Sequence, residues 1–99
     1  MDTLAAGSLA PTVYRIYTED KPVVGIIARY FEGYTLFHGT GVYKSQLESS
    51  VVIEIVDAFQ YRDKVVRLAA EIADANRQAE VLVTWQSSHG FERVRVFGK

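Results

Sequence analysis

The residues best suited to chemistry lie in the segment GYTLFHGTGVY, Gly33 to Tyr43. Gly39 and Gly41 bracket a threonine there, directly after a histidine. Glycine lets backbone N–H groups approach a ligand closely, so this segment could bind a small anionic or nucleotide-like molecule, with His38 and Thr40 as hydrogen-bonding partners. Strand glycines also mark bulges and bends. The spacing matches neither the phosphate-binding P-loop nor the dinucleotide fingerprint, which favours a bent strand over a ligand loop.

Proton transfer is the second chemistry that the segment could support. His38 could act as a general base if a carboxylate on the partner strand, such as Glu54, oriented its imidazole. A shift of one residue in strand pairing would instead place the two side chains on opposite faces. We assign no catalytic residue, and the candidate ligand-binding residues are Tyr34, His38, Gly39, Thr40, Gly41, Tyr43 and Glu54.

The remaining histidine gives no convincing site. His89 lies in SSHG, a predicted turn, and adjacent side chains such as Ser88 and His89 rarely meet in productive geometry on a tight turn. The two histidines and the scattered carboxylates lack metal-ligand spacing, and cysteine is absent. We therefore expect no metal, no disulfide and no cofactor.

Composition limits the class of protein. The chain has 99 residues, 48% hydrophobic and 23% charged, which is typical of one globular domain. Its net charge of −1 gives no uniform attraction to nucleic acid or anionic lipid. The N-terminus has acidic Asp2 in place of a basic segment, and no run approaches the roughly 20 apolar residues of a membrane helix. We expect a cytoplasmic protein with a flexible arm over residues 1–11 and one α+β domain over residues 12–99.

The first half of the domain is predicted to contain a strand, a helix and a hairpin. The strand covers residues 12–18, where β-branched and aromatic residues dominate. Asp20 is a plausible N-cap, and the apolar spacing up to Phe31 fits a helix that Gly33 would end in the left-handed region. Residues 34–44 and 49–57 are two β-rich runs, which predict an antiparallel hairpin with the loop SQLES.

The second half is predicted to contain a helix and a second hairpin. Asp57 and Gln60 have the spacing of a capping box, and Asn76 is an end signal. The buried stripe between them is predicted to be Tyr61, Val65, Leu68, Ala69, Ile72 and Ala73. EVLVTWQ and FERVRVF alternate around the turn SSHG, and the last run resembles an edge strand with a charged face.

This order, β-α-β-β-α-β-β, predicts a two-layer ferredoxin-like sandwich with both helices on one face of an antiparallel sheet. The other face would then expose aromatic and aliphatic side chains, and such a patch marks an interaction surface. We expect a homo-oligomer, with a dimer favoured. The candidate interface residues are Tyr14, Phe37, Trp85 and Phe91.

Glycine, threonine and serine positions carry one resemblance. The series comprises Gly33, Thr35, Gly39, Gly41 and Tyr43, then Glu48 and Ser50, an amphipathic helix, and Gln78 before Val81 and Leu82. Over about residues 12–86 it resembles a family of small bacterial α/β proteins of unknown function, which has tryptophan where this chain has Tyr43. The resemblance implies a ferredoxin-like fold and oligomerisation, and carries over no catalytic residue.

Three functions remain open on the sequence alone. The favoured one is a non-enzymatic, homo-oligomeric module that binds a small molecule or a protein near the Gly39–Gly41 bend. The second is a small enzyme of the dimeric α+β barrel type, with a pocket lined by Tyr14, Tyr34, His38 and Glu54.

The third function is RNA binding by the C-terminal hairpin. Arg93 and Arg95 would supply positive charge, and Trp85 and Phe91 would supply stacking surfaces. Acidic residues are interleaved with these basic residues, which favours an ordinary ion-paired surface over nucleic-acid binding.

Overall fold

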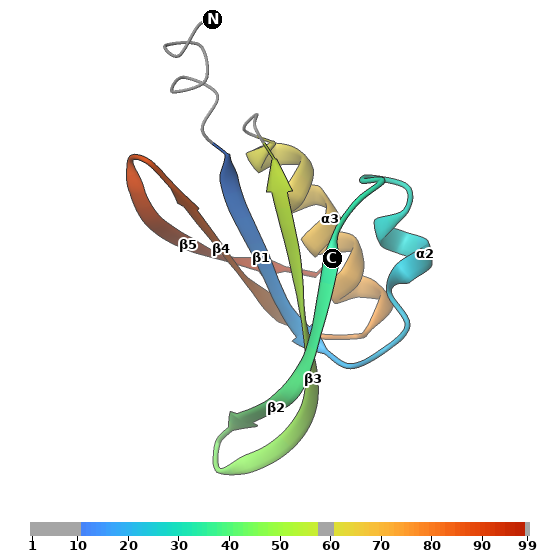
Figure 1. The fold of residues 1–99 in the computed structure, drawn as a ribbon. Helices are drawn as coiled ribbons and strands as arrows, with labels where there is room; N and C mark the ends of the chain where they lie inside the picture. The colour runs from blue at the N-terminus through green and yellow to red at the C-terminus, as the bar shows by residue number, and fades with distance from the viewer. Residues whose placement is uncertain (1–10, 58–60, 99) are drawn as a thin grey trace, which may run out of the picture.

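One five-stranded antiparallel sheet carries two helices on a single face (Figure 1). The computed structural model describes residues 11–57 and 61–98. Its elements are β1 (Thr12–Glu19), α2 (Val24–Ile27), β2 (Thr35–Tyr43), β3 (Gln46–Asp57), α3 (Arg62–Ala75), β4 (Glu80–Ser87) and β5 (Gly90–Phe97). The strand order is β2-β3-β1-β4-β5, with β1 at the centre. The predicted α+β class and element order are therefore confirmed.

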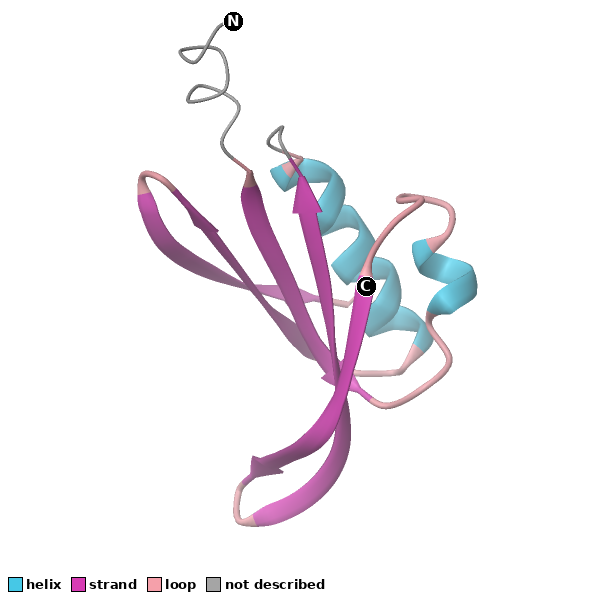
Figure 2. Cartoon of the chain, viewed as in Figure 1, coloured by secondary structure: helices cyan, strands magenta, loops and turns pink. Residues whose placement is uncertain are grey.

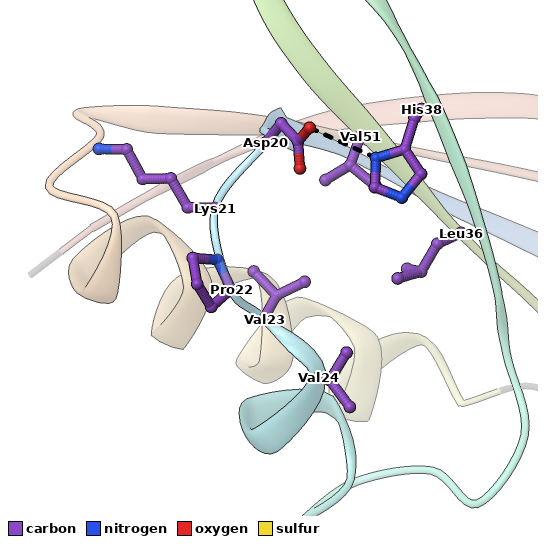
Figure 3. Close-up of a pocket in the computed structure, with 8 residues that line it drawn as sticks. All are labelled: Asp20, Lys21, Pro22, Val23, Val24, Leu36, His38 and Val51. Atoms are coloured by element: carbon purple, nitrogen blue, oxygen red, sulfur yellow. Dashed lines mark hydrogen bonds and ion pairs between the residues drawn. The ribbon is translucent and has the colours of Figure 1, made fainter.

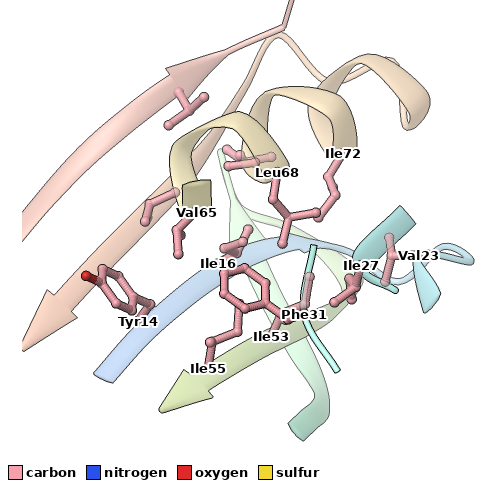
Figure 4. Close-up of a cluster of buried hydrophobic side chains, with 14 of the residues drawn as sticks. Tyr14, Ile16, Val23, Ile27, Phe31, Ile53, Ile55, Val65, Leu68 and Ile72 are labelled. Atoms are coloured by element: carbon pink, nitrogen blue, oxygen red, sulfur yellow. The ribbon is translucent and has the colours of Figure 1, made fainter. Parts of the chain in front are cut away.

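The core lies between the sheet and the helices (Figure 4). Alternation along β1 turns Tyr14 and Ile16 toward α3, and Ile53 of β3 lies beside Ile16. Leu68 and Ile72 of α3 pack onto them, as the helical spacing predicts. Each fully buried side chain of this size contributes roughly 1.5–3 kcal/mol. The buried face of the sheet and the stripe of α3 are thus both set by simple periodicity.

The first helix is much shorter than predicted. α2 has four residues, its N-cap position is Val23, and no side chain caps it. Asp20 is therefore not the cap, and Gly33 does not have a positive φ. Gly25 and the β-branched residues around it disfavour a longer helix. The apolar spacing nevertheless identifies buried residues correctly, because Val23 and Ile27 lie in the core.

The first hairpin is tighter than predicted. Its loop is the two-residue turn Lys44–Ser45, with φ of 50° and 64°, instead of the five-residue SQLES. Two left-handed residues suit the twist of a short hairpin. β3 is thereby longer than expected, and the far ends of β2 and β3 extend beyond β1 and curl away from the helices (Figure 2). The prediction of a bent β2 agrees with this shape.

α3 fits its prediction in the middle and at its end. Four of its buried residues are Val65, Leu68, Ile72 and Ala73, whereas Tyr61 is the N-cap position and is 37% exposed. The predicted capping box depends on Gln60, which lies outside the described residues. Asn76 is the C-cap, as predicted.

The last hairpin is as predicted, with β5 at the sheet edge and Ser88–His89 in its turn. The predicted N-terminal arm lies, apart from Pro11, outside the described residues. Within residues 11–57 and 61–98, no helix is long and apolar enough to cross a membrane.

Candidate functional site

The alternation of β2 divides the candidate ligand-binding residues between two faces. Thr35 pairs with Glu54, and His38 pairs with Val51, so Glu54 and His38 point to opposite sides of the sheet. Glu54 therefore does not orient His38, because the two residues are three positions out of register. The residues on the helix side are His38 and Thr40, and those on the open side are Gly39, Gly41, Tyr43 and Glu54. Tyr34, before β2, packs against the core.

A first hollow lies beside His38 on the helix side (Figure 3). It has a volume of about 360 Å³, and most of its wall is apolar, from Val23, Val24 and Leu36 among others. His38 Nδ1 lies 3.4 Å from Oδ2 of Asp20 at its rim, and both side chains are solvent-exposed. Among the described residues that line this hollow, none is Phe, Tyr or Trp.

The face of the sheet opposite the helices, hereafter the open face, is partly apolar. Phe37 and Phe91, two of the candidate interface residues, are 50% and 61% exposed on it. Tyr14 and Trp85 do not belong to this face. They are 1% and 8% exposed and lie in the core on the helix side, because their positions in β1 and β4 alternate inward.

A second hollow lies at one end of the open face and is called the open-face hollow below. It has a volume of about 500 Å³, which is within the usual range for small-molecule sites. Tyr17 of β1 and Tyr43 of β2 line it, together with the start of β4 and the α3–β4 connection. The curl of the β2–β3 hairpin forms one wall. Gly39 and Gly41 place no side chains along that stretch of the face, where their partners are Ser50 and Glu48.

The open-face hollow holds charges of both signs. Three carboxylates and two guanidinium groups line it, which leaves one negative charge in excess. Glu19 pairs with Lys21 at 3.1 Å, and Glu80 pairs with Arg95 at 3.2 Å. The side chains of Glu48 and Arg77 have no ion-pair or hydrogen-bond partner among the described residues. A free carboxylate and a free guanidinium group in one hollow match the two charges of an amino-acid group.

Buried hydrogen bonds hold the α3–β4 connection against β1. Thr18 and Asn76 are each 5% exposed, and Asn76 Nδ2 donates to Thr18 Oγ1 at 3.1 Å. Thr18 Oγ1 in turn donates to Gln78 Oε1, which lines the open-face hollow. Lys21 Nζ donates to the carbonyl oxygen of Asn76 at 3.2 Å. This wall of the hollow is therefore fixed by the fold before any ligand binds.

Among the aromatic and charged residues that line the open-face hollow, Tyr43 alone is a candidate ligand-binding residue in the sequence; the others are Tyr17, Glu19, Glu48, Arg77, Glu80 and Arg95. They come from β1, β3, the α3–β4 connection, β4 and β5, and no local pattern connects them. The one local feature that singles out Arg77 is its positive φ, and the structure reveals this backbone conformation whereas the sequence does not.

The RNA-binding hypothesis loses support. Trp85 cannot offer a stacking surface for RNA, since it is buried and the Arg62 guanidinium lies 5.1 Å from its ring centroid. Within the described part of the chain, no group of three histidine or acidic side chains could hold a metal ion.

One titratable group outside both hollows has a shifted pKa. Desolvation and then a hydrogen bond to Glu71 raise the pKa of Tyr30 above its ordinary value of 10. The phenol of Tyr30 therefore stays protonated at neutral pH and takes no evident part in proton transfer.

Comparison with known proteins identifies the fold. No protein-family model and no curated protein sequence matches the chain. A phage SAM lyase in complex with S-methyl-5'-thioadenosine is 23% identical with a TM-score of 0.71, over 90% of this chain and 91% of that one. A phage SAM lyase in the apo state is 24% identical with a TM-score of 0.73, over 100% of this chain and 96% of that one. The chain shares the fold of these structures.

These neighbours correct two expectations. The prediction of a non-enzymatic binding module of unknown function is wrong, because the proteins that share the fold are a lyase with a known substrate. The resemblance to a bacterial family of unknown function is likewise not supported. The small α+β fold that this resemblance implied is supported by the two neighbours. The small molecule in one neighbour agrees with the expectation of a small-molecule ligand.

Proposed function

We propose that this protein is a small enzyme that cleaves S-adenosylmethionine (SAM) and releases S-methyl-5'-thioadenosine, with the open-face hollow as its active site. The fold shared with a SAM lyase supports the reaction class. The observation that carries the location is the pairing of two tyrosine rings with an unpaired carboxylate and an unpaired guanidinium group in one hollow.

The chemistry of the substrate fits this lining. SAM carries a sulfonium, an ammonium and a carboxylate, so its net charge is opposite to the single negative excess of the hollow. Tyr17 and Tyr43 offer faces against which an adenine can stack, although Lys44 Nζ, 5.4 Å from the ring centroid of Tyr43, occupies one face of that ring. Glu48 is placed to attract the cationic end of the substrate, since no residue described in the structure neutralises it.

The bond that must break joins the sulfonium to the γ carbon of the methionine part. Its electron pair stays on sulfur, which leaves as the neutral thioether. A lyase adds no water, so the four-carbon fragment either closes onto its own carboxylate oxygen or loses a proton from its β carbon to a base. Of the three carboxylates in the open-face hollow, Glu48 is the one without an ion-pair partner among the described residues, so it is the group placed to take that proton.

The test is turnover by the purified full-length chain. We expect the chain to convert SAM to methylthioadenosine, measured by chromatography and mass spectrometry. Glu48→Gln should lower kcat/KM at least about tenfold, as for loss of one charged contact. Glu32→Gln is the matched control, because Glu32 is exposed and does not line the open-face hollow. An inactive wild-type protein that also fails to bind methylthioadenosine would end the proposal.

Proton NMR of the second product separates the two chemical routes. The lactone and the olefinic amino acid have the same mass, but the olefin alone has vinyl protons. Vinyl signals would support a base role for Glu48, and their absence would favour attack by the substrate's own carboxylate.

We further propose that the chain is a homo-oligomer that meets through the open face, with a dimer favoured. The exposed rings of Phe37 and Phe91 support this, together with Val56, which is 55% exposed on the same face. These residues lie on β2, β5 and β3, so exposed apolar side chains occur from one edge of this face to the other, and exposed apolar surface of this kind is typical of an interface.

The finer description of the fold is also a proposal. The order β2-β3-β1-β4, with a helix before β2 and another before β4, supports a ferredoxin-like sandwich to which β5 adds an edge strand. We propose that residues 12–99 form this single domain after an N-terminal arm over residues 1–11. A cytoplasmic location is proposed because SAM is made and used there.

A further inference from the structure

Arg77 has a backbone conformation that arginine rarely adopts. Its φ is 56°, in the left-handed region directly after α3. Gln78 N donates to the carbonyl oxygen of Ala73 at 2.8 Å, and Arg77 N donates to that of Asp74 at 3.1 Å. This is the Schellman arrangement, in which glycine is usual at the position of Arg77. A side chain retained there at a cost in strain points to a role for that side chain.

The surroundings of Arg77 suggest the role. Its neighbours Asn76 and Gln78 are tied to Thr18 by side-chain hydrogen bonds, which fix the backbone on both sides of it. The side chain itself lines the open-face hollow and has no ion-pair or hydrogen-bond partner among the described residues. The other arginine of the hollow, Arg95, is already paired with Glu80. Arg77 is therefore the free anion-binding group on a rigid wall.

We propose that Arg77 recognises the α-carboxylate of the substrate and thereby distinguishes SAM from methylthioadenosine. This inference rests on the proposed function. A guanidinium group binds a carboxylate through two parallel hydrogen bonds, a geometry that lysine does not reproduce. Methylthioadenosine has the adenine, the ribose and the sulfur but no carboxylate. Arg77 thus contributes to binding before the bond breaks and does not hold the thioether product.

The decisive variant is Arg77→Gly, because glycine suits the left-handed backbone. We expect the melting temperature to stay level or to rise by a few degrees. KM for SAM should rise about 10- to 100-fold, and the Kd of methylthioadenosine should stay within about twofold of wild type. Arg77→Lys should recover only part of the loss in KM.

Two control variants separate this role from general effects of charge and strain. Arg67→Gln removes an exposed cation of α3 that does not line the open-face hollow. Ser45→Gly replaces another left-handed residue, with φ of 64°, that does not line it either. Both should leave KM for SAM unchanged.

The outcomes distinguish the two proposals. If wild type cleaves SAM and Arg77→Gly keeps the wild-type KM, the role of Arg77 is refuted while the proposed function stands. A rise in both the KM for SAM and the Kd of methylthioadenosine would also refute it, since the effect would not depend on the carboxylate. If wild type neither binds nor cleaves SAM, both proposals fall together.

Discussion

Nε of Arg15 lies 2.9 Å from Oε2 of Glu54 at the centre of the open face, where the two residues sit opposite each other on β1 and β3. Their side chains are 33% and 21% exposed, so water screens the pair only in part. The ion pair places two charges on a face that is otherwise partly apolar. It also gives the Glu54 carboxylate a hydrogen-bond donor, the Arg15 guanidinium group. Glu54 is therefore assigned to the structure of the sheet and not to the orientation of His38.

Loss of this pair should destabilise the sheet. Glu54→Gln is expected to lower the free energy of unfolding by about 1 kcal/mol, because it leaves a half-buried guanidinium without its counter-charge. Urea denaturation measures this, and Glu32→Gln is the control. Equal midpoints for the two variants would show that the pair adds nothing to stability.

His38→Ala tests which hollow is active. With catalysis in the open-face hollow, kcat/KM for SAM should stay within about twofold of wild type. Thermal stability should change little, since the His38 side chain is 62% exposed. A loss of turnover of a hundredfold or more with an unchanged melting temperature would move the active site to the hollow between Asp20 and Leu36.

The ring of Tyr43 should matter more than its hydroxyl. Tyr43→Leu is expected to weaken methylthioadenosine binding about 5- to 100-fold, the range for loss of one base-stacking aromatic. Tyr43→Phe keeps the ring and should bind nearly as well as wild type. Isothermal titration calorimetry measures both. Equal affinities for the Leu and Phe variants would remove Tyr43 from the adenine site.

Assembly should depend on the open face. Phe37→Lys combined with Phe91→Lys places two cations on the proposed interface, and we expect light scattering after gel filtration to report a smaller species. Val24→Lys is the control, because Val24 is 55% exposed on α2, which lies on the helix side. A wild-type monomer, or a double variant with the wild-type mass, would contradict an interface on this face.

Tyr30 predicts a specific response to alkaline pH. A raised folded pKa means that the folded state holds the phenolic proton more tightly than the unfolded state. The resulting stability is fully present below pH 10 and is lost as pH rises through the raised value. Tyr30→Phe lacks this contribution, so its deficit in the free energy of unfolding against wild type should shrink as pH rises above 10 in urea titrations. A difference in the free energy of unfolding that stays constant with pH would show that the Tyr30 hydroxyl stabilises the protein through packing alone.

Periodicity was sufficient for the parts of the fold where one face is buried. Val65, Leu68 and Ile72 are predicted correctly because a helix repeats at a known interval, whereas the faces of β1 were not assigned and Tyr14 was expected on the open face. The length of α2 was overestimated because Val23 and Ile27 reach the core from a four-residue helix. The predicted length of the first hairpin loop was wrong because Lys44 and Ser45 form a two-residue turn in left-handed conformations, and no glycine marks this turn in the sequence.

The open-face hollow could not be predicted in the same way. Tyr43 was selected because it lies in a glycine-rich strand, whereas Arg77 and Arg95 follow no motif. Their proximity depends on the curl of the β2–β3 hairpin and on the pairing of β4 with β5, and neither the curl nor the strand order is encoded in the spacing of one segment.

The central position of β1 has a consequence for synthesis of the protein. Among the described strands β1 is made first, but its partners are β3 and β4, and Tyr17 pairs with both Val52 and Leu82. The β2–β3 and β4–β5 hairpins can form from neighbouring residues, while the strand that joins them must wait for contacts distant in sequence. A nascent chain should therefore stay incomplete until β4 has left the ribosome, with the apolar residues of β1 available to chaperones until then.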